Sequence, residues 1–154
     1  MRKKVSIGAL AAAALLLSTG LAGAQSSGTA AEARAMLEKA IAALKANEAE
    51  ALKQFSNPAG GFKDRDLYVF CFNTSDGKFT AHLNPALMGT DVRTLKAGDD
   101  PLGQRIFDTI KDEPEGKIGT IDYKFPRPGT TEAVDKQSFL VRVGNEGCGG
   151  GYYK

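Results

Sequence analysis

The chain has 154 residues, of which 25% are charged, and a formal net charge of +2. This length is sufficient for one domain with a hydrophobic core. Residues 1–24 hold three of the 20 Lys and Arg residues and none of the 18 Asp and Glu residues, so the rest of the chain is close to neutral. This charge balance gives no reason to expect nucleic acid or an anionic membrane as a partner.

The N-terminus has the pattern of a secretory signal peptide. The basic residues Arg2-Lys3-Lys4 precede an apolar run over residues 5–17, and the small residues Ala22-Gly23-Ala24 follow. An uncleaved membrane anchor is the alternative, but the run is shorter than the ~20 residues that span a bilayer. We therefore expect residues 1–24 to be a cleaved signal peptide. Residues 25–154 are expected to be one soluble, periplasmic domain without membrane insertion.

Residues 29–55 are predicted to form one long amphipathic helix. Thr29 and Glu32 fit a capping box at its start, and the segment Asn57-Pro58-Ala59-Gly60-Gly61 ends it. Its apolar residues recur at helical spacing and form one stripe. The stripe consists of Met36, Leu37, Ala40, Ile41, Leu44, Ala51, Leu52 and Phe55.

Residues 68–83 are predicted to form a β-hairpin around Asp76-Gly77, a pair that suits a two-residue type I′ turn. In that register Phe72 faces Ala81 and Cys71 faces His82, and side chains alternate between two faces. We expect the predicted helix to cover the aromatic face, which carries Tyr68, Phe70, Phe72, Phe79, Ala81 and Leu83. We expect the other, semi-polar face to host a small-ligand pocket; it carries Val69, Cys71, Asn73, Thr80, His82 and Asn84.

The remaining elements complete an α+β domain. A second helix is expected after Pro101, and strands are expected at residues 118–125 and 136–143. The last strand, Cys148 to Tyr153, is rich in glycine and pairs poorly unless it is central. This order of elements favours an antiparallel sheet with helices. The two cysteines, Cys71 and Cys148, are expected either to form a disulfide in the oxidising compartment or to remain small buried thiols.

Several segments resemble a single-Cache domain, the PAS-like extracytoplasmic sensor module of bacterial chemoreceptors and sensor kinases. The resemblance extends over about residues 29–154. The segments that carry it are Tyr68-Val69-Phe70, Asp76-Gly77, Ala81-His82, Gly89-Thr90-Asp91-Val92, Tyr123 to Pro126, Lys136-Gln137-Ser138-Phe139 and Gly147 to Tyr152. The resemblance implies a five-stranded antiparallel sheet, a long N-terminal helix packed on one face, and a front cavity for short organic acids. It also makes a Cys71–Cys148 bridge between neighbouring strands geometrically reasonable.

The resemblance further implies ligand-binding residues. His82 and Lys136 match positions of the family pattern, as does Tyr123 at the end of the third strand. A histidine donates a hydrogen bond to a carboxylate, and a lysine supplies a cation; a structural histidine and a solvated lysine are the alternatives. The full expected ligand-binding set is His82, Lys136, Tyr123, Ser138, Tyr68 and Tyr152.

Two features depart from the family. Its third-strand Trp is absent, with Gly119-Thr120 in that region, and we expect no transmembrane segment after Lys154. The resemblance therefore implies a free-standing periplasmic binding and sensing domain, with a small organic acid as ligand and a membrane receptor or sensor kinase as partner. The alternative is an accessory protein that binds a partner protein and no small ligand.

Enzymatic and metal chemistry are not expected. Cys71 opposite His82 has no third group to orient a nucleophile–base pair. One histidine and no Cys-x-x-Cys motif leave few ligands for a metal. No haem-attachment motif or phosphate-binding loop occurs, so no cofactor is expected.

Overall fold

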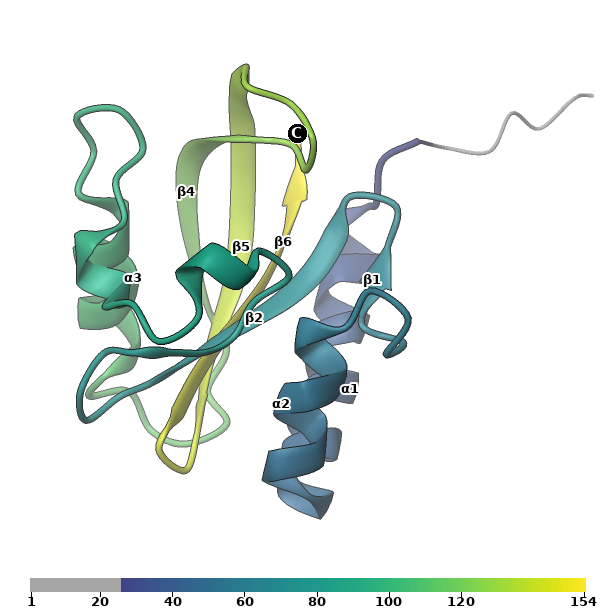
Figure 1. Cartoon of the computed structure of the whole chain (residues 1–154), viewed down its shortest axis with the longest axis vertical. Coiled ribbons are helices and arrows are strands. Elements are labelled where there is room, and N and C mark those ends of the chain that lie inside the picture. The colour runs from purple at the N-terminus through teal and green to yellow at the C-terminus, as the bar shows by residue number, and fades with distance from the viewer. Residues whose placement is uncertain (1–25) are drawn as a thin grey trace, which may run out of the picture.

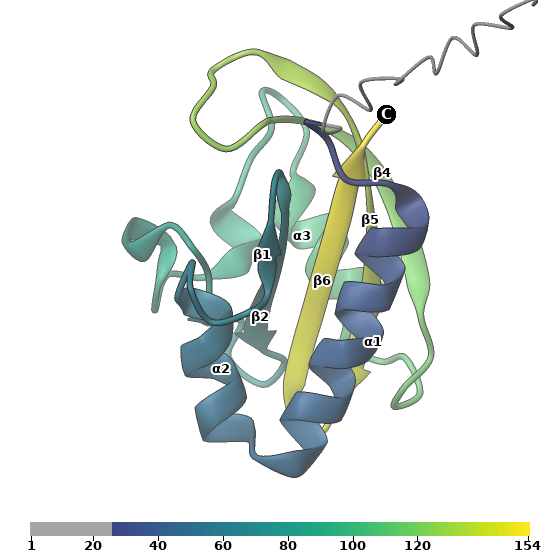
Figure 2. The same cartoon turned by 90° about the vertical axis from the view of Figure 1, so that its right-hand side faces the viewer.

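The computed structural model describes residues 26–154, so the predicted signal peptide at residues 1–24 lies outside the described residues. Helices lie on both sides of one antiparallel sheet (Figure 1, Figure 2), which confirms the predicted α+β class. The sheet has six strands in place of the five expected. The helices are α1 (Ala30–Ala46), α2 (Glu48–Ser56) and α3 (Leu102–Ile110), with short 3-10 helices η1 (Pro85–Leu87) and η2 (Val92–Thr94). The strands are β1 (Lys63–Asp64), β2 (Leu67–Asn73), β3 (Phe79–Ala81), β4 (Gly119–Pro126), β5 (Ala133–Val143) and β6 (Glu146–Tyr153).

The predicted helix over residues 29–55 is in fact two helices. Its start is as expected, because Thr29 and Glu32 form a capping box. At Asn47, however, the backbone is extended (φ −161°, ψ 96°), and the Asn47 side chain accepts a hydrogen bond from the Glu50 N–H. Asparagine stabilises helix ends because its side-chain oxygen satisfies an unpaired backbone N–H. Asn47 therefore ends α1 and begins α2.

The glycine-rich strand β6 is central. The strand order is β1-β2-β6-β5-β4, and β3 pairs with β2. A Cβ at Gly149 would collide with the ring of Phe70, and a Cβ at Gly151 would collide with the Ser138 hydroxyl. The missing side chains of β6 thus let groups from both neighbouring strands lie over it.

The hairpin register differs from the prediction. Cys71 pairs with Ala81 and Phe72 pairs with Phe79, with an irregularity between the two pairs. Gly77 has the expected positive φ of 77°, but the Asn73 N–H donates to the Lys78 carbonyl, so four residues, 74–77, form the turn. The wider turn is stabilised by the Asn73 side chain, which accepts a hydrogen bond from the Ser75 N–H.

The two sheet faces are covered in the opposite way from the prediction. Helices α1 and α2 pack on the face that carries Val69, Cys71 and Ala81. The aromatic residues of β2 and β3 instead pack against α3, η2 and the inner face of β4 and β5. Both faces of β2 are apolar and buried, so alternation alone does not determine which face the first helix covers. The aromatic face is the one that remains for a pocket.

Cys71 and Cys148 form a disulfide between directly paired residues of β2 and β6, with their Cα atoms 4.1 Å apart. Both residues are fully buried under α1 and α2. The bridge therefore joins two strands on the face opposite to the aromatic cluster. Within residues 26–154, no helix has the length and apolar character needed to cross a membrane.

Candidate ligand-binding pocket

Lys136 lies in the aromatic face of the sheet and is only 2% exposed. In β5 it is paired directly with Tyr123 of β4 and with Tyr153 of β6. Directly paired residues project to the same face of a sheet, so these three side chains lie together. The Lys136 Nζ donates hydrogen bonds to the hydroxyl oxygens of Tyr68 (3.1 Å) and Tyr153 (3.4 Å).

Four aromatic rings surround the Lys136 ammonium group. Its nitrogen lies 4.4 Å from the ring centre of Tyr68, 4.6 Å from that of Tyr153, 5.7 Å from that of Phe125 and 6.0 Å from that of Tyr123. Ring faces attract a cation. They supply less stabilisation than a carboxylate would in the same buried position.

Within residues 26–154, no carboxylate forms an ion pair with Lys136. Burial lowers the Lys136 pKa to about 7, and the more distant charge of Asp66 opposes this shift. The Asp66 carboxylate is already engaged, because it accepts from the Gly28 N–H (2.7 Å) and pairs with Arg127. Lys136 is thus a buried basic group whose charge lacks a counter-ion.

His82 lies one residue beyond β3, on the aromatic face rather than on the semi-polar face predicted for it. Its ring centre is 5.6 Å from those of Tyr68 and Phe79. The His82 Nδ1 accepts a hydrogen bond from the Asn84 N–H (2.8 Å). Burial, with the nearby charge of Lys136, lowers the His82 pKa to about 4. The imidazole is therefore neutral at neutral pH, and its proton resides on Nε2, which is a hydrogen-bond donor.

Of the other four predicted site residues, three lie with Lys136 and His82 and one does not. Tyr123 and the buried Ser138 share a hydrogen bond of 2.7 Å, and burial raises the Tyr123 pKa to about 12. Tyr68 contacts both Lys136 and His82, so the set brought together is Lys136, His82, Tyr68, Tyr123 and Ser138. Tyr152 lies on the opposite face, where its ring stacks on Phe139 and its hydroxyl donates to Gln137.

The expected ligand-binding set omits Tyr153 and Phe125, which both contact Lys136. The alternation of side chains between the two faces of the last strand could have identified Tyr153. Lys136 pairs with Tyr153 and Gln137 pairs with Tyr152, so the residue on the Lys136 face is the second of the two tyrosines. The three consecutive glycines before the two tyrosines have no side chains, so the sequence does not show which tyrosine lies on which face.

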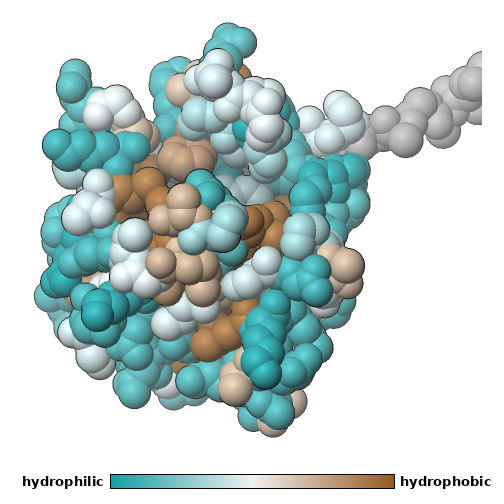
Figure 3. Space-filling view, in the orientation of Figure 1, coloured by the Kyte–Doolittle hydropathy of each residue, from teal (hydrophilic) through white to brown (hydrophobic). Residues whose placement is uncertain are grey.

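Two neighbouring spaces lie on this face of the sheet and share lining residues, although Lys136 itself lines neither of them. An inner cavity of about 20 Å³ is lined by Tyr68, Phe70, Phe79, His82, Leu95, Leu102, Ile106, Tyr123 and Phe125. That volume accommodates about one water molecule. A more open cleft of about 410 Å³ shares Tyr68, His82 and Phe125 with it and extends between residues 83–87 and residues 126–130. Figure 3 shows apolar side chains gathered at the centre of this side of the molecule, between hydrophilic margins.

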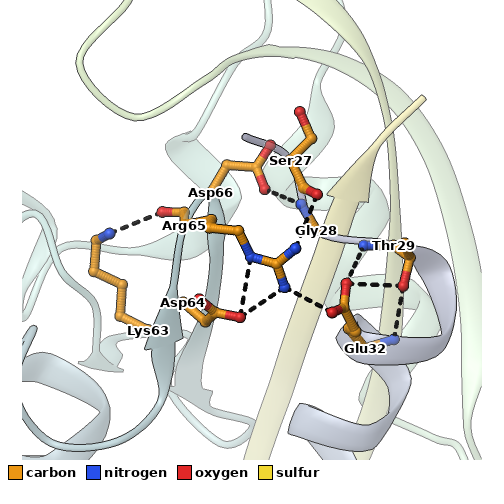
Figure 4. Close-up of polar contacts among 8 residues, drawn as sticks. All are labelled: Ser27, Gly28, Thr29, Glu32, Lys63, Asp64, Arg65 and Asp66. Carbon is orange, nitrogen blue, oxygen red and sulfur yellow. Dashed lines mark hydrogen bonds and ion pairs between the residues drawn. The ribbon is translucent and has the colours of Figure 1, made fainter. Parts of the chain in front are cut away.

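The segment that precedes α1 is fixed beside this cleft (Figure 4). The Gly28 N–H donates to Asp66, and the Ser27 carbonyl accepts from the Arg65 guanidinium (3.1 Å). Arg65 also pairs with Glu32 of α1 and with Asp64, and it has a positive φ of 54°. These contacts fix Asp66 at the side of the sheet where Arg127 meets it.

Comparison with known proteins identifies the fold. The sequence matches no family model and no curated protein. Among solved structures, the chain is similar to a Cache chemosensory domain described for carboxylic acid recognition, with a TM-score of 0.58 and 22% identity over 80% of this chain and 86% of the other. The chain has the Cache fold. A methyl-accepting chemotaxis protein of Vibrio parahaemolyticus (TM-score 0.64, 18% identity) covers the same shares of the two chains.

A periplasmic sensor domain of a chemotaxis protein has the same fold, with a TM-score of 0.57 and 23% identity over 80% of this chain and 88% of that one. All three similar structures are described as chemosensory or chemotaxis proteins. Among the residues that the structure describes, no three His, Cys, Asp or Glu side chains form a group suited to a metal ion. The polar groups gathered on the aromatic face are the Lys136 amine, the His82 imidazole and the hydroxyls of the neighbouring tyrosines and Ser138.

Proposed function

We propose that this domain is a periplasmic sensor that binds a small organic acid in the pocket in front of Lys136. The observation that carries the proposal is the Lys136 ammonium group, which is 2% exposed and lacks a carboxylate partner within residues 26–154. A buried charge without a counter-ion is costly. A ligand carboxylate supplies the counter-ion, and so binds in preference to a neutral molecule of the same shape.

The neighbouring groups complete a receptor for one carboxylate. The ammonium donates hydrogen bonds, and the His82 Nε2–H is a further donor on the same side of the sheet. Charge-assisted hydrogen bonds of this kind are stronger than neutral ones. The apolar walls suit a short carbon chain. The similar Cache domain described for carboxylic acid recognition supports the same ligand class.

The inner cavity of about 20 Å³ is too small for a carboxylate. In this proposal, the ring of Phe125 and the adjoining residues 126–130 move outward and join the cavity to the cleft. This movement is the signal that a membrane receptor or sensor kinase would detect. The small cavity is also the observation that favours the alternative, an accessory protein without a small ligand.

The test is calorimetry and thermal unfolding of residues 25–154 with acetate, propionate, pyruvate and lactate. Ligands that bind only the folded state raise the melting temperature. We expect saturable stabilisation by at least one acid, which Lys136→Met abolishes and Lys124→Met, a change on the exposed side of β4, leaves intact. Because the variant removes a buried unpaired charge, it should keep or raise the melting temperature without ligand.

Stabilisation that persists in Lys136→Met would overturn the assignment of Lys136. The absence of stabilisation by every acid in the wild-type protein would favour the accessory-protein alternative. Export of the full chain and N-terminal sequencing of the periplasmic product test the predicted cleavage after Ala24.

A further inference from the structure

We infer that Arg127 recognises a second anionic group, so that the pocket selects short dicarboxylates over monocarboxylates. This inference rests on the proposed function and concerns the far end of the same ligand. Arg127 is the one residue with a charged side chain among those that line the cleft in residues 26–154. Its side chain is 33% exposed, so water reaches it only in part.

The Arg127 guanidinium is held in place from one side. Its Nη1 pairs with the Asp66 carboxylate and donates to the Ser27 hydroxyl (3.0 Å). Neither Asp66 nor Ser27 lines the cleft. Asp66 is itself fixed by the Gly28 N–H (Figure 4). Arg127 therefore has a defined orientation before any ligand arrives, which lowers the entropy cost of binding.

The other edge of the guanidinium is available. Within residues 26–154, the Arg127 Nε and Nη2 donate to no acceptor, since both of its side-chain hydrogen bonds come from Nη1. Two parallel N–H groups on one edge of a guanidinium match the two oxygens of a carboxylate. The Asp66 contact thus leaves a bidentate carboxylate site at the cleft.

Arg127 and Lys136 are close enough to act on one small molecule. The Arg127 guanidinium carbon lies 4.6 Å from the ring centre of Tyr153, and the Lys136 nitrogen lies 4.6 Å from the same point. The two cations are therefore separated by no more than twice that distance. A short dicarboxylate has the length to place one carboxylate at each cation.

The test compares propionate and succinate, which differ by the second carboxylate, by calorimetry at constant ionic strength. A bidentate charge-assisted contact corresponds to roughly 10- to 100-fold in affinity, so wild-type protein should bind succinate at least tenfold more tightly. Arg127→Lys keeps the positive charge toward Asp66 but loses the Nε–Nη2 edge. We expect it to bring the succinate-to-propionate ratio close to one while propionate affinity is retained.

Arg105→Lys is the matched control, because Arg105 pairs with Asp100 and lines no part of the cleft; it should keep the preference. Equal or tighter binding of propionate by the wild-type protein would overturn the role of Arg127 and leave the proposed function standing. A succinate preference that survives Arg127→Lys would do the same. Binding of neither acid would overturn the role of Arg127, and it would overturn the proposed function as well only if acetate, pyruvate and lactate also fail to bind.

Discussion

The Nζ of Lys136 lies 3.1 Å from the hydroxyl oxygen of Tyr68, in a site that is buried and lacks a carboxylate partner within residues 26–154. A tyrosine hydroxyl accepts the hydrogen bond but does not neutralise the charge. Burial also raises the pKa of Tyr68 well above its ordinary value, so the hydroxyl does not ionise to become the counter-ion. The site can therefore change its charge with pH and with ligand.

The first prediction concerns ligand affinity and pH. A bound carboxylate favours the protonated amine and raises the Lys136 pKa from about 7. Binding at pH 8 must then take up a proton, and affinity must fall as pH rises above about 7. Calorimetry in buffers of different ionisation enthalpy measures this uptake. Proton release at pH 8, or an affinity that rises between pH 7 and 9, would contradict the assignment.

The same group gives a prediction for the stability of the ligand-free protein. The folded-state pKa of Lys136 is about 7, below its ordinary value of 10.5. Between these values the unfolded chain binds more protons than the folded one, so Lys136 makes stability rise with pH, by at most about 1.4 kcal/mol per pH unit. Denaturant unfolding of the wild type and Lys136→Met from pH 7 to 10 isolates this slope. Parallel curves for the two proteins would show that the lysine titrates normally.

His82 gives a matching prediction at acidic pH. Its folded-state pKa is about 4, below its ordinary value of 6.5, because the ring is buried near Lys136. The unfolded chain therefore binds the extra proton between about pH 4 and 6.5, and stability falls as pH falls through that window. His82→Gln should flatten this part of the curve. Nuclear magnetic resonance of the single histidine checks the pKa directly, and a value near 6.5 would exclude the buried, neutral ring.

The two adjacent tyrosines provide a matched pair for binding. Tyr153→Phe removes the hydroxyl that contacts Lys136 and donates to the Pro126 carbonyl (2.7 Å) at the cleft wall. One hydrogen bond to a charged group corresponds to about 1.5–3 kcal/mol, so carboxylate affinity should fall at least several-fold. Tyr152→Phe changes a hydroxyl on the opposite face and should leave affinity unchanged. Equal effects of the two substitutions would contradict the placement of the pocket.

Gly151 gives a prediction for stability. An added Cβ would collide with the Ser138 hydroxyl and approach the Lys136 side chain. Overpacking of this kind typically costs about 1–3 kcal/mol, so Gly151→Ala should lower the denaturant midpoint. Gly119→Ala is the control, since no atom lies within 4 Å of its added Cβ and its φ is not positive. A Gly151→Ala protein as stable as Gly119→Ala would show that the strand can shift away.

The sequence permits a correct prediction of the fold class, and it indicates that the glycine-rich strand β6 pairs well only in a central position, which is where it lies. Alternation over residues 136–143 predicts that Lys136 and Ser138 lie on one face of the strand and Phe139 and Val141 on the other. The structure agrees, because Phe139 and Val141 pack in the cluster under α1 and α2. The covering of β2 was not predictable, because both of its faces are apolar. His82 was assigned to the wrong face for a local reason: the register irregularity after Cys71 shifts β3 relative to an ideal hairpin.

The error in the face covered by the first helix and the error in the face that carries His82 compensate each other. The pocket was expected on the semi-polar face with His82, but α1 and α2 cover that face and His82 lies on the other one. His82 and Lys136 therefore lie on the same side, as expected, in front of aromatic residues that were assigned to the core behind them. Arg127 was not predicted at all, because its ion-pair partner Asp66 is far away in the sequence.

The central position of β6 has a consequence for how the domain folds. Cys71 of β2 pairs with Cys148 of β6 across a sequence separation of 77 residues. Contacts of such long sequence separation slow folding, since a large loop must close before any of them form. Until β6 inserts, β2 and β5 share no sheet and Lys136 lacks both of its hydroxyl partners. The domain is therefore expected to fold late and as a unit, and a fragment that ends before residue 146 should acquire neither the sheet nor the receptor site.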